Sequence, residues 1–379
     1  MNQVVLLAGC PGENPTLYRE IGLPAGDPAA SIHVGNDQYI IIRDIEVDRA
    51  RQTRPNAVVA CPADFAPASG LDADRATATA QAVTEFCQRQ GLVSVTTDRT
   101  LPFVFAWYLM QQNIRLRYDA DLGVRDRRTK NAAEIAALQQ AQQVTEQGML
   151  YLCRLIANCE IDANGILMHA GTQLTSQRAR ALAAAFFSDR GFSMGHGAIV
   201  ATAPHSADCH HAGEGPLRTG LPIIVDLFPR DDRSRYWGDC TRTVVHGQPS
   251  ATVRQMHHAV VQAKAAAVAR LMPGNDAADV HRAVVEVQQQ FGFPCSRGTL
   301  TNHASIQHGT GHGIGLEVHE PILLDEGGGK ILAGEVFTIE PGLYGRDPGG
   351  VRVEDMYVVT ANGPRNLNQL PEGLDWSKV

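Results

Sequence analysis

The stretch Thr301–Glu320, TNHASIQHGTGHGIGLEVHE, contains four histidines and a run rich in glycine. Glycine has no Cβ, so the backbone of such a run can approach a ligand closely. Histidine is the commonest side-chain metal ligand and a frequent carrier of protons. The stretch therefore predicts a metal or catalytic site, and the rest of the chain is expected to bring further polar groups to it.

Four carboxylates stand in or beside apolar segments that should be buried: Asp226, Asp239, Glu340 and Glu354. A buried carboxylate must be paired, protonated or bound to a cation, and none of the four has an obvious lysine neighbour. Two divalent ions, bridged by a carboxylate, would relieve their mutual repulsion. An oxygen-rich set with one imidazole suits Mn, Co, Fe or Zn better than Ca. Taken singly, such an aspartate is more often a turn or cap residue, so the joint occurrence carries the prediction.

Composition limits the class of protein. The chain has 379 residues and a net charge of −7, which indicates about two domains and argues against a nucleic-acid binder. No apolar run is long enough to cross a bilayer. Leu7–Cys10 looks like a lipoprotein box, but no basic residue precedes it, so we expect a buried strand there. The eight scattered cysteines are typical of reduced thiols in a cytoplasmic protein.

The first part of the chain alternates short apolar strands with a helix. Strands are expected at Gln38–Arg43, Val58–Cys61 and Leu92–Thr96, and a helix at Asp74–Gln90. This order predicts a small, mostly parallel sheet. The polar stretch Asp121–Lys130 is the expected domain boundary, which gives domains 1–124 and 125–379.

The second part repeats one order of elements. Helices at Asn131–Ala157 and from Thr175 or Ser176 to Asp189 precede strand-like segments that include Leu221–Phe228 and Asp239–His246. Helices at Ser250–Leu271 and Asp276–Phe291 then precede strand-like segments at Glu335–Ile339 and Val351–Val359. The repeat predicts an internal pseudo-two-fold, with two halves that meet at a shared site.

Four motifs, IVDLFPR…YWGDCTRT, HGTGHGIGLEVHE, FTIEPGLY and GVRVEDM, resemble those of one superfamily. It contains methionine aminopeptidase, prolidase, aminopeptidase P and creatinase, and its fold is called pita-bread. The resemblance covers roughly Arg127 to the C-terminus, and YIIIRDIEVDRAR is similar to the family's creatinase-type N-domain. It implies an α+β protein in which a pita-bread catalytic domain follows a smaller α/β domain.

The resemblance also implies a set of metal ligands. Asp226 would bind one ion, His312 and Glu340 would bind the other, and Asp239 and Glu354 would bridge both. The family's ions are usually Mn or Co, with Zn or Fe also found. A water or hydroxide between the ions would be the nucleophile, and Glu340 would be the general base.

Further site residues follow from the same motifs. His319 and His210 match histidines that contact the scissile carbonyl and the tetrahedral intermediate, and His308 matches a histidine of proline-specific members. Arg352 matches an arginine that supports the metal-binding carboxylates. His211 stands beside His210 and leaves that assignment open; we take His211 as a surface residue.

The implied reaction is hydrolysis of Xaa-Pro bonds, in which the proline nitrogen carries no N–H. The sequence does not separate a prolidase, which cleaves dipeptides, from an aminopeptidase P, which cleaves longer peptides. A methionine aminopeptidase, a creatinase-like hydrolase without metal and a non-catalytic binding module are the alternatives. The presence of all five ligands favours a metallopeptidase. Its expected partners are a peptide with proline in second position and, from the family, a second copy in a homodimer.

Overall fold

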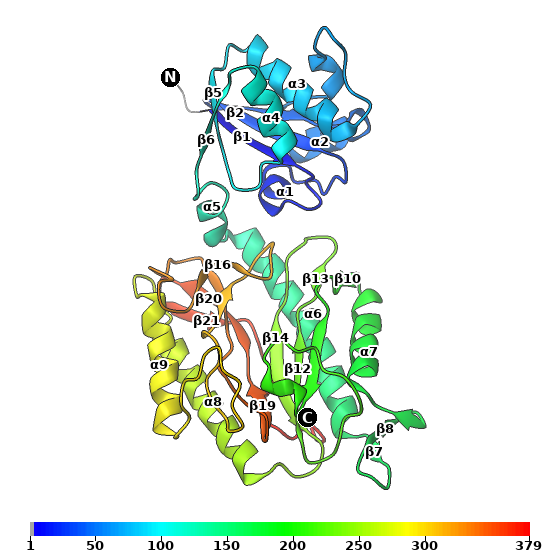
Figure 1. Ribbon diagram of the computed structural model, residues 1–379, viewed down its shortest axis with the longest axis vertical. Coiled ribbons are helices and arrows are strands. Elements are labelled where there is room, and N and C mark those ends of the chain that lie inside the picture. The colour runs from blue at the N-terminus through cyan, green and yellow to red at the C-terminus, as the bar shows by residue number, and fades with distance from the viewer. Residues whose placement is uncertain (1–3) are drawn as a thin grey trace. The chain divides into compact units, whose positions relative to one another are not determined.

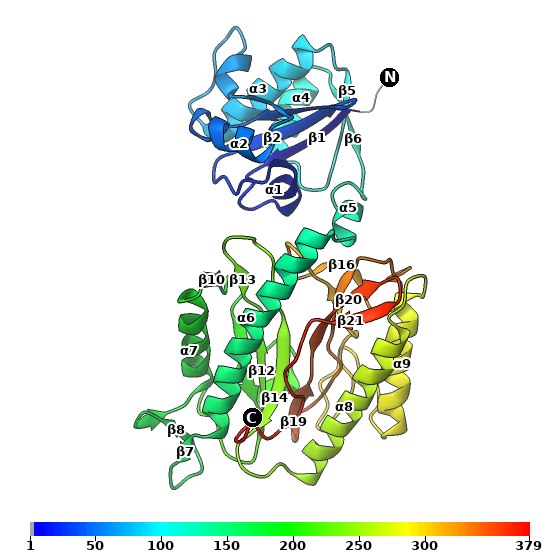
Figure 2. The same cartoon turned by 180° about the vertical axis from the view of Figure 1, so that it is seen from behind.

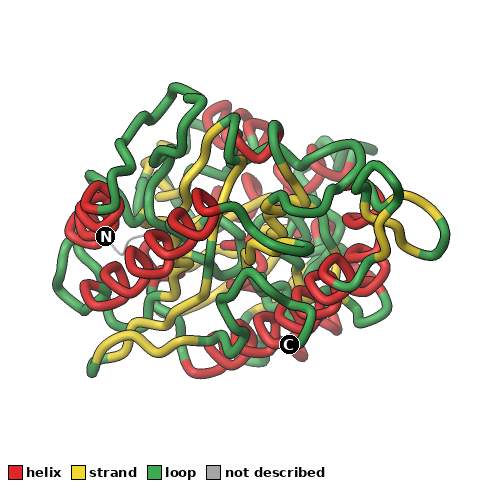
Figure 3. Tube along the Cα trace, turned by 90° about the horizontal axis from the view of Figure 1, so that it is seen from below, coloured by secondary structure: helices red, strands yellow, loops and turns green. Residues whose placement is uncertain are grey.

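The chain divides into two compact units, Met1–Arg127 and Arg128–Val379, each with its own apolar core. The computed structural model describes residues 4–379, so the first three residues of the predicted N-terminal domain lie outside the described residues. The division falls inside the short helix α5 (Arg125–Arg128), close to the expected boundary at 124/125. Figure 3 shows the mixture of helices, strands and long loops. Within residues 4–379, no helix combines the length and the apolar character needed to cross a membrane.

The N-terminal unit is built on one six-stranded sheet with the order β4-β3-β2-β1-β5-β6. Its strands are β1 (Val4–Gly9), β2 (Ala29–Val34), β3 (Asp37–Ile41), β4 (Val58–Ala60), β5 (Ser94–Thr97) and β6 (Arg115–Tyr118). The buried strand expected near the N-terminus is β1. The pairs β1–β2 and β2–β3 are antiparallel and the other three are parallel. The sheet is therefore mixed, because β2, which was not predicted, joins its neighbours through antiparallel connections.

Short helices surround this sheet: α1 (Pro15–Ile21), η1 (Asp44–Glu46), α2 (Val47–Thr53), η2 (Pro62–Phe65), α3 (Arg75–Arg89) and α4 (Phe103–Gln111). The predicted helix at Asp74–Gln90 is α3, and the Asp74 side chain caps it by accepting the backbone N–H of Thr77. Helices α3 and α4 pack together, and α3 also contacts β2 and β3.

The C-terminal unit consists of two halves with the same order of elements (Figure 1). The first half has helices α6 (Ala132–Ala157) and α7 (Ser176–Ser188) and the sheet β11-β12-β14. The second half has helices α8 (Ala251–Arg270) and α9 (Ala277–Gln290) and the sheet β16-β15-β17-β20-β21. The first sheet contains β11 (Ala198–Thr202), β12 (Pro222–Leu227) and β14 (Cys240–Val245). The second contains β15 (His312–Gly313), β16 (Glu320–Leu323), β17 (Val336–Ile339), β20 (Asp355–Thr360) and β21 (Gly363–Asn366).

Each of the four long helices begins at a residue whose side chain accepts a backbone N–H: Asn131, Thr175, Ser250 and Asp276. Such caps satisfy donors that have no partner inside the helix. Figure 2 shows α6 and α8 on the near side of the strands. Helix α6 contacts β12 and β14, and α8 contacts β17 and the hairpin strand β19 (Gly349–Arg352). The helices thus cover one side of the sheets.

The strand-like segment predicted at Val351–Val359 contains parts of two strands, not one. Strand β19 ends at Arg352 and pairs with β18 (Gly342–Gly345), whereas β20 begins at Asp355 in the five-stranded sheet. Between them, the backbone N–H of Glu354 donates to Thr241 O at 3.0 Å. The chain therefore changes sheets at Glu354, where it pairs with β14 of the first half. The remaining short elements are β7 (Glu160–Ile161), β8 (Leu167–His169), β9 (Thr172–Gln173), β10 (Phe192–Ser193), β13 (Arg230–Asp231) and η3 (His205–Ala207).

Candidate metal centre

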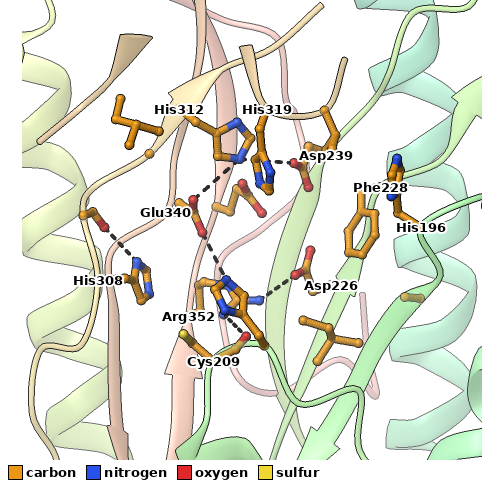
Figure 4. Close-up of a pocket in the computed structure, with 18 of the residues that line it drawn as sticks. His196, Cys209, Asp226, Phe228, Asp239, His308, His312, His319, Glu340 and Arg352 are labelled. Carbon is orange, nitrogen blue, oxygen red and sulfur yellow. Dashed lines mark hydrogen bonds and ion pairs between the residues drawn. The ribbon is translucent and has the colours of Figure 1, made fainter. Parts of the chain in front are cut away.

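A cavity of about 630 Å³ in the C-terminal unit is lined by every side chain that the sequence predicted for the site. These side chains are His210, Asp226, Asp239, His308, His312, His319, Glu340, Arg352 and Glu354. Figure 4 shows carboxylates and imidazoles from both halves of the unit pointing into the same space. The structure therefore brings together residues from all four sequence motifs.

Strand pairing places the first two carboxylates. In the antiparallel pair β12–β14, Asp226 lies opposite Thr241. Directly opposed residues share one face of a sheet, and residues two apart along a strand share it too. Asp239, two positions before Thr241, is therefore presented to the same side as Asp226.

The second half supplies the imidazole and the next carboxylate. His312 lies in β15, and its backbone N–H donates to Thr338 Oγ1 of β17 at 3.2 Å. Glu340 follows β17 directly. A Cβ at Gly311 would lie 1.9 Å from Thr338 O, so only glycine allows β15 to approach β17 this closely. The glycine next to His312 in the opening motif has this packing role.

The His312 ring faces two carboxylates. Its Nε2 lies 3.7 Å from Asp239 Oδ2 and 3.7 Å from Glu340 Oε1. Its Nδ1 lies 3.1 Å from Gly313 O, and a carbonyl can only accept, so Nδ1 carries the proton and donates it. In the neutral ring, Nε2 then directs a lone pair towards two carboxylates. Ligand atoms of Asp239, His312 and Glu354 all lie within 4.8 Å of one another.

The charges of this cluster are not balanced by the protein. Burial and the nearby carboxylates of Glu354 and Asp226 raise the pKa of Asp239 well above its ordinary value. Burial raises the pKa of Glu340 to about 7 and lowers the pKa of His312 to about 3. Both shifts are those expected of groups removed from water without sufficient counter-charge.

Asp226 offers a ligand atom of its own. Its Oδ2 accepts from Arg352 Nη2 at 2.6 Å, while its buried Oδ1 has no hydrogen-bond partner among the described residues. A buried acceptor without a partner is rare. Four carboxylates and one neutral imidazole around a common space therefore fit divalent cations of the Mn, Co, Fe or Zn kind.

A hydrogen-bonded chain leads from Asp226 across the floor of the cavity. Arg352 Nη1 donates to Tyr344 Oη at 2.9 Å, and Tyr344 Oη lies 2.7 Å from His308 Nε2. His308 Nδ1 lies 2.8 Å from Gly309 O and must donate to it. Since Arg352 can only donate, the Tyr344 hydroxyl accepts from Arg352 and donates to His308. Both ring nitrogens of His308 are thus bound to protein groups.

His319 and His210 present more accessible rings. The His319 ring lies 4.3 Å from the His312 ring, centroid to centroid, at 88°. The sequence gives no role to His211, and its Nδ1 accepts the backbone N–H of Gly213 at 2.9 Å. Its ring also stacks on His205 at 4.4 Å. His210 and His319 line the cavity.

Three residues that hold this site were missed at the sequence level: Tyr344, Thr241 and Gln142. Thr241 Oγ1 donates to Glu354 Oε2 at 2.7 Å. Gln142, fully buried on α6, accepts the backbone N–H of Asp239 at 2.8 Å and donates to its carbonyl at 2.6 Å. Strand alternation could have identified Thr241, and a glutamine within the apolar face of a helix could have marked Gln142.

Comparison with known proteins identifies the family. Residues 136–361, more than half of the chain, match metallopeptidase family M24, and the chain belongs to that family. The chain resembles the probable dipeptidase PepE of Mycobacterium tuberculosis, with 35% identity over 178 residues, 46% of this chain and 45% of that protein. It thus matches about half the length of that relative. An Xaa-Pro dipeptidase of Pyrococcus horikoshii is 27% identical over 289 residues, 75% of this chain and 76% of that protein.

The solved structure of an Xaa-Pro dipeptidase from Bacillus anthracis superimposes with a TM-score of 0.81 at 20% identity, over 98% of this chain and 94% of that chain. A likeness at this identity shows the fold: an N-terminal domain followed by a C-terminal pita-bread domain. The family and the fold class predicted from the motifs are confirmed.

Proposed function

We propose that the protein is a dinuclear metal-dependent peptidase that hydrolyses Xaa-Pro bonds. The observation that carries the proposal is the convergence of four carboxylates and a neutral imidazole in one cavity, where, in the described part of the chain, Arg352 is the single arginine that faces them. The names of the relatives, dipeptidase and Xaa-Pro dipeptidase, support the substrate class. We propose Mn or Co as the ions, with Zn or Fe as alternatives.

Five residues would hold the ions. Asp226 would bind one ion, and His312 and Glu340 the other, while Asp239 and Glu354 would be shared. Bound divalent ions lower the pKa of a water and polarise the carbonyl that is attacked. The Asp226 carboxylate is oriented for this by Arg352, and Thr241 orients the Glu354 carboxylate.

Glu340 is the proposed general base. Its carboxylate lies between His312 Nε2, at 3.7 Å, and Arg352 Nε, at 3.9 Å, and its side chain remains 19% exposed to the cavity. It can therefore be reached by a water, and a positioned carboxylate of this kind accepts the proton released in attack. Glu340 can then pass that proton to the leaving nitrogen of proline.

The accessible histidines are proposed to bind the reacting carbonyl. His319 and His210 line the cavity and could donate N–H groups to the oxygen that gains negative charge during attack. His308 would act on the site through Tyr344 and Arg352, because both of its ring nitrogens are bound to protein groups.

The proposal also covers the substrate size, the cellular compartment and the oligomeric state. The substrate is a short peptide with proline in second position, and the cavity volume of about 630 Å³ is in the usual range of small-ligand sites. The eight free cysteines favour a reducing compartment, and we propose a cytoplasmic protein. A homodimer is proposed from the family resemblance.

Hydrolysis of Ala-Pro and of Ala-Pro-Ala, by protein that is stripped of metal and then reloaded with Mn or Co, tests the proposal. Metal-dependent cleavage of the dipeptide alone would define a prolidase, and cleavage of the tripeptide would define an aminopeptidase P. Ala-Ala and Ala-Ala-Ala are the matched peptides without proline. Two bound ions without cleavage of any Xaa-Pro peptide would refute the substrate class, and a protein that binds no ions would favour a binding module.

A further inference from the structure

Behind the carboxylate cluster lies a second group of charges, formed by the buried side chains of Arg242, Lys264 and Asp355 and the partly exposed side chain of Glu372. Successive residues of an extended chain point to opposite sides. Glu354 therefore faces the cavity, whereas Asp355 points away from it and pairs with Arg242 Nη2 at 2.7 Å. Two consecutive residues, Glu354 and Asp355, therefore belong to the two different groups of charges.

Arg242 is fully buried and connects three segments. Its Nη1 donates to Glu354 O at 2.5 Å and to Thr241 O at 2.9 Å. Its Nε donates to Pro371 O at 2.9 Å, and its Nη2 donates to Leu370 O at 3.2 Å. The guanidinium of Arg242 thus binds backbone carbonyls of three segments: Glu354, Thr241 in the strand of Arg242 itself, and Leu370 and Pro371 near the C-terminus.

These contacts lie where the two halves of the unit meet. Arg242 belongs to β14 of the first half, and Glu354 precedes β20 of the second half. The two proposed bridging carboxylates, those of Asp239 and Glu354, come from opposite sides of this junction. Their separation therefore depends on the bonds that cross it, which include Glu354 N–H to Thr241 O at 3.0 Å and the contacts of Arg242.

The rear group of charges is balanced, unlike the front cluster. Asp355 lies between Arg242 and Lys264, and Lys264 Nζ also pairs with Glu372 Oε1 at 2.5 Å. Buried pairs of this kind often contribute little net stability compared with apolar packing. The fixed directions of the guanidinium donors, which lysine cannot reproduce, point to a geometric role.

We propose that Arg242 is a positioning residue of the metal centre. With Asp355 and the carbonyls of Leu370 and Pro371, it fixes the separation of the Asp239 and Glu354 carboxylates that would share both ions. The C-terminal segment is thereby a structural part of the centre. This inference rests on the proposed function, since it concerns the same ligands.

Arg242→Lys tests the inference because it keeps the charge and removes the planar fork. Metal-free protein is titrated with Co²⁺ and followed by calorimetry and by the visible absorption of the bound ion. We expect cobalt affinity to fall about 10- to 100-fold, the usual effect of losing a residue that orients metal ligands. We also expect a changed absorption spectrum, and a lower kcat on an Xaa-Pro peptide with little change in KM.

Arg54→Lys is the matched control. Like Arg242, which donates to four backbone carbonyls, Arg54 donates to several, those of Glu20, Thr53 and Arg19, at 2.6, 2.9 and 2.5 Å. It belongs to the N-terminal unit. Its replacement should lower the unfolding temperature and leave cobalt affinity and spectrum unchanged. If Arg242→Lys behaved in the same way, Arg242 would be a stabilising residue only and the inference would be overturned.

Asp355→Asn is the second variant, for use if Arg242→Lys does not fold. It keeps the side-chain size and weakens the hold on Arg242, so weaker cobalt binding is again expected, and unchanged binding would overturn the inference. If the wild type bound two ions but cleaved no Xaa-Pro peptide, the proposed function would fail while cobalt binding still decided the role of Arg242. If the wild type bound no ions, both would fall.

Discussion

Replacing Asp239 by asparagine should change the stability of the metal-free and the metal-loaded protein in opposite directions. The Asp239 side chain is buried, and one of its oxygens lies within 4.8 Å of a carboxylate oxygen of Glu354. At an effective dielectric constant of about 20, two unit charges at that separation repel by about 3 kcal/mol. Among the described residues, the Asp239 carboxylate has no hydrogen-bond partner at normal distance. Replacement by asparagine therefore removes the charge repulsion without breaking a hydrogen bond.

The effect should depend on pH in a defined sense. Burial and neighbouring carboxylates raise the pKa of Asp239, so the metal-free native state binds more protons than the unfolded state between the ordinary and the raised pKa. Wild-type stability must then fall as the pH rises through that window. The advantage of Asp239→Asn should be small near the ordinary carboxyl pKa of about 3.9 and should grow above it.

Scanning calorimetry in chelator and in Mn²⁺ or Co²⁺, between about pH 5 and pH 8, would measure both effects. For a unit of this size 1 kcal/mol shifts the unfolding temperature by about 2–4 °C. The variant should therefore unfold several degrees higher than wild type in chelator at the upper pH, and lower than wild type with metal. Asp347→Asn, at an exposed aspartate of the same unit, should show no reversal. A variant less stable than wild type in chelator at every pH would refute the reasoning.

Three further changes test separate parts of the site. Tyr344→Phe removes the hydroxyl that accepts from Arg352. Because a buried hydrogen bond to a charged group contributes about 1.5–3 kcal/mol, the unfolding temperature and kcat should both fall. An unchanged kcat would count against a functional role of the hydrogen bonds that link Arg352, Tyr344 and His308. His319→Ala should keep both ions by elemental analysis and lower kcat by about 10²–10³, and loss of the ions would show that its assigned role is wrong. Glu320→Gln leaves Lys130, paired at 2.8 Å and buried, without its counter-charge, so denaturant unfolding should show a loss of about 3–5 kcal/mol; unaltered stability would mean that Lys130 finds another partner.

The helix ends of the C-terminal unit could be predicted because their signals are local. Asn131, Thr175, Ser250 and Asp276 each accept an N–H from a residue two or three positions further on, and such caps are visible in any short window of sequence. The break in the strand at Glu354 could not be predicted in this way. It depends on a hydrogen bond to Thr241, more than a hundred positions earlier in the chain.

The same distinction applies to the site. The grouping of the four carboxylates could be predicted because each of them stands in or beside an apolar segment, where a charged side chain is unusual. Tyr344 stands in a quoted motif, yet its role depends on the spatial approach of His308 and Arg352. Gln142 lies on a helix distant in sequence from Asp239 and clamps its backbone. The helix pattern could mark Gln142 as a buried polar residue, but its pairing with Asp239 is a tertiary contact and leaves no spacing signal.

The two groups of charges on either side of Glu354 differ in their counter-charge. The only long cationic side chain that reaches this backbone from α8, Lys264, pairs with Asp355 on the rear side, and Arg242 joins it there. On the cavity side, within residues 4–379, Arg352 alone faces the four carboxylates. The fold thus places two cationic side chains beside Asp355, the residue next to Glu354. Among the described residues, the shortage of cationic side chains is found on the cavity side and not on the rear side. Buried anions that the protein leaves without sufficient counter-charge are the arrangement that divalent ions would complete.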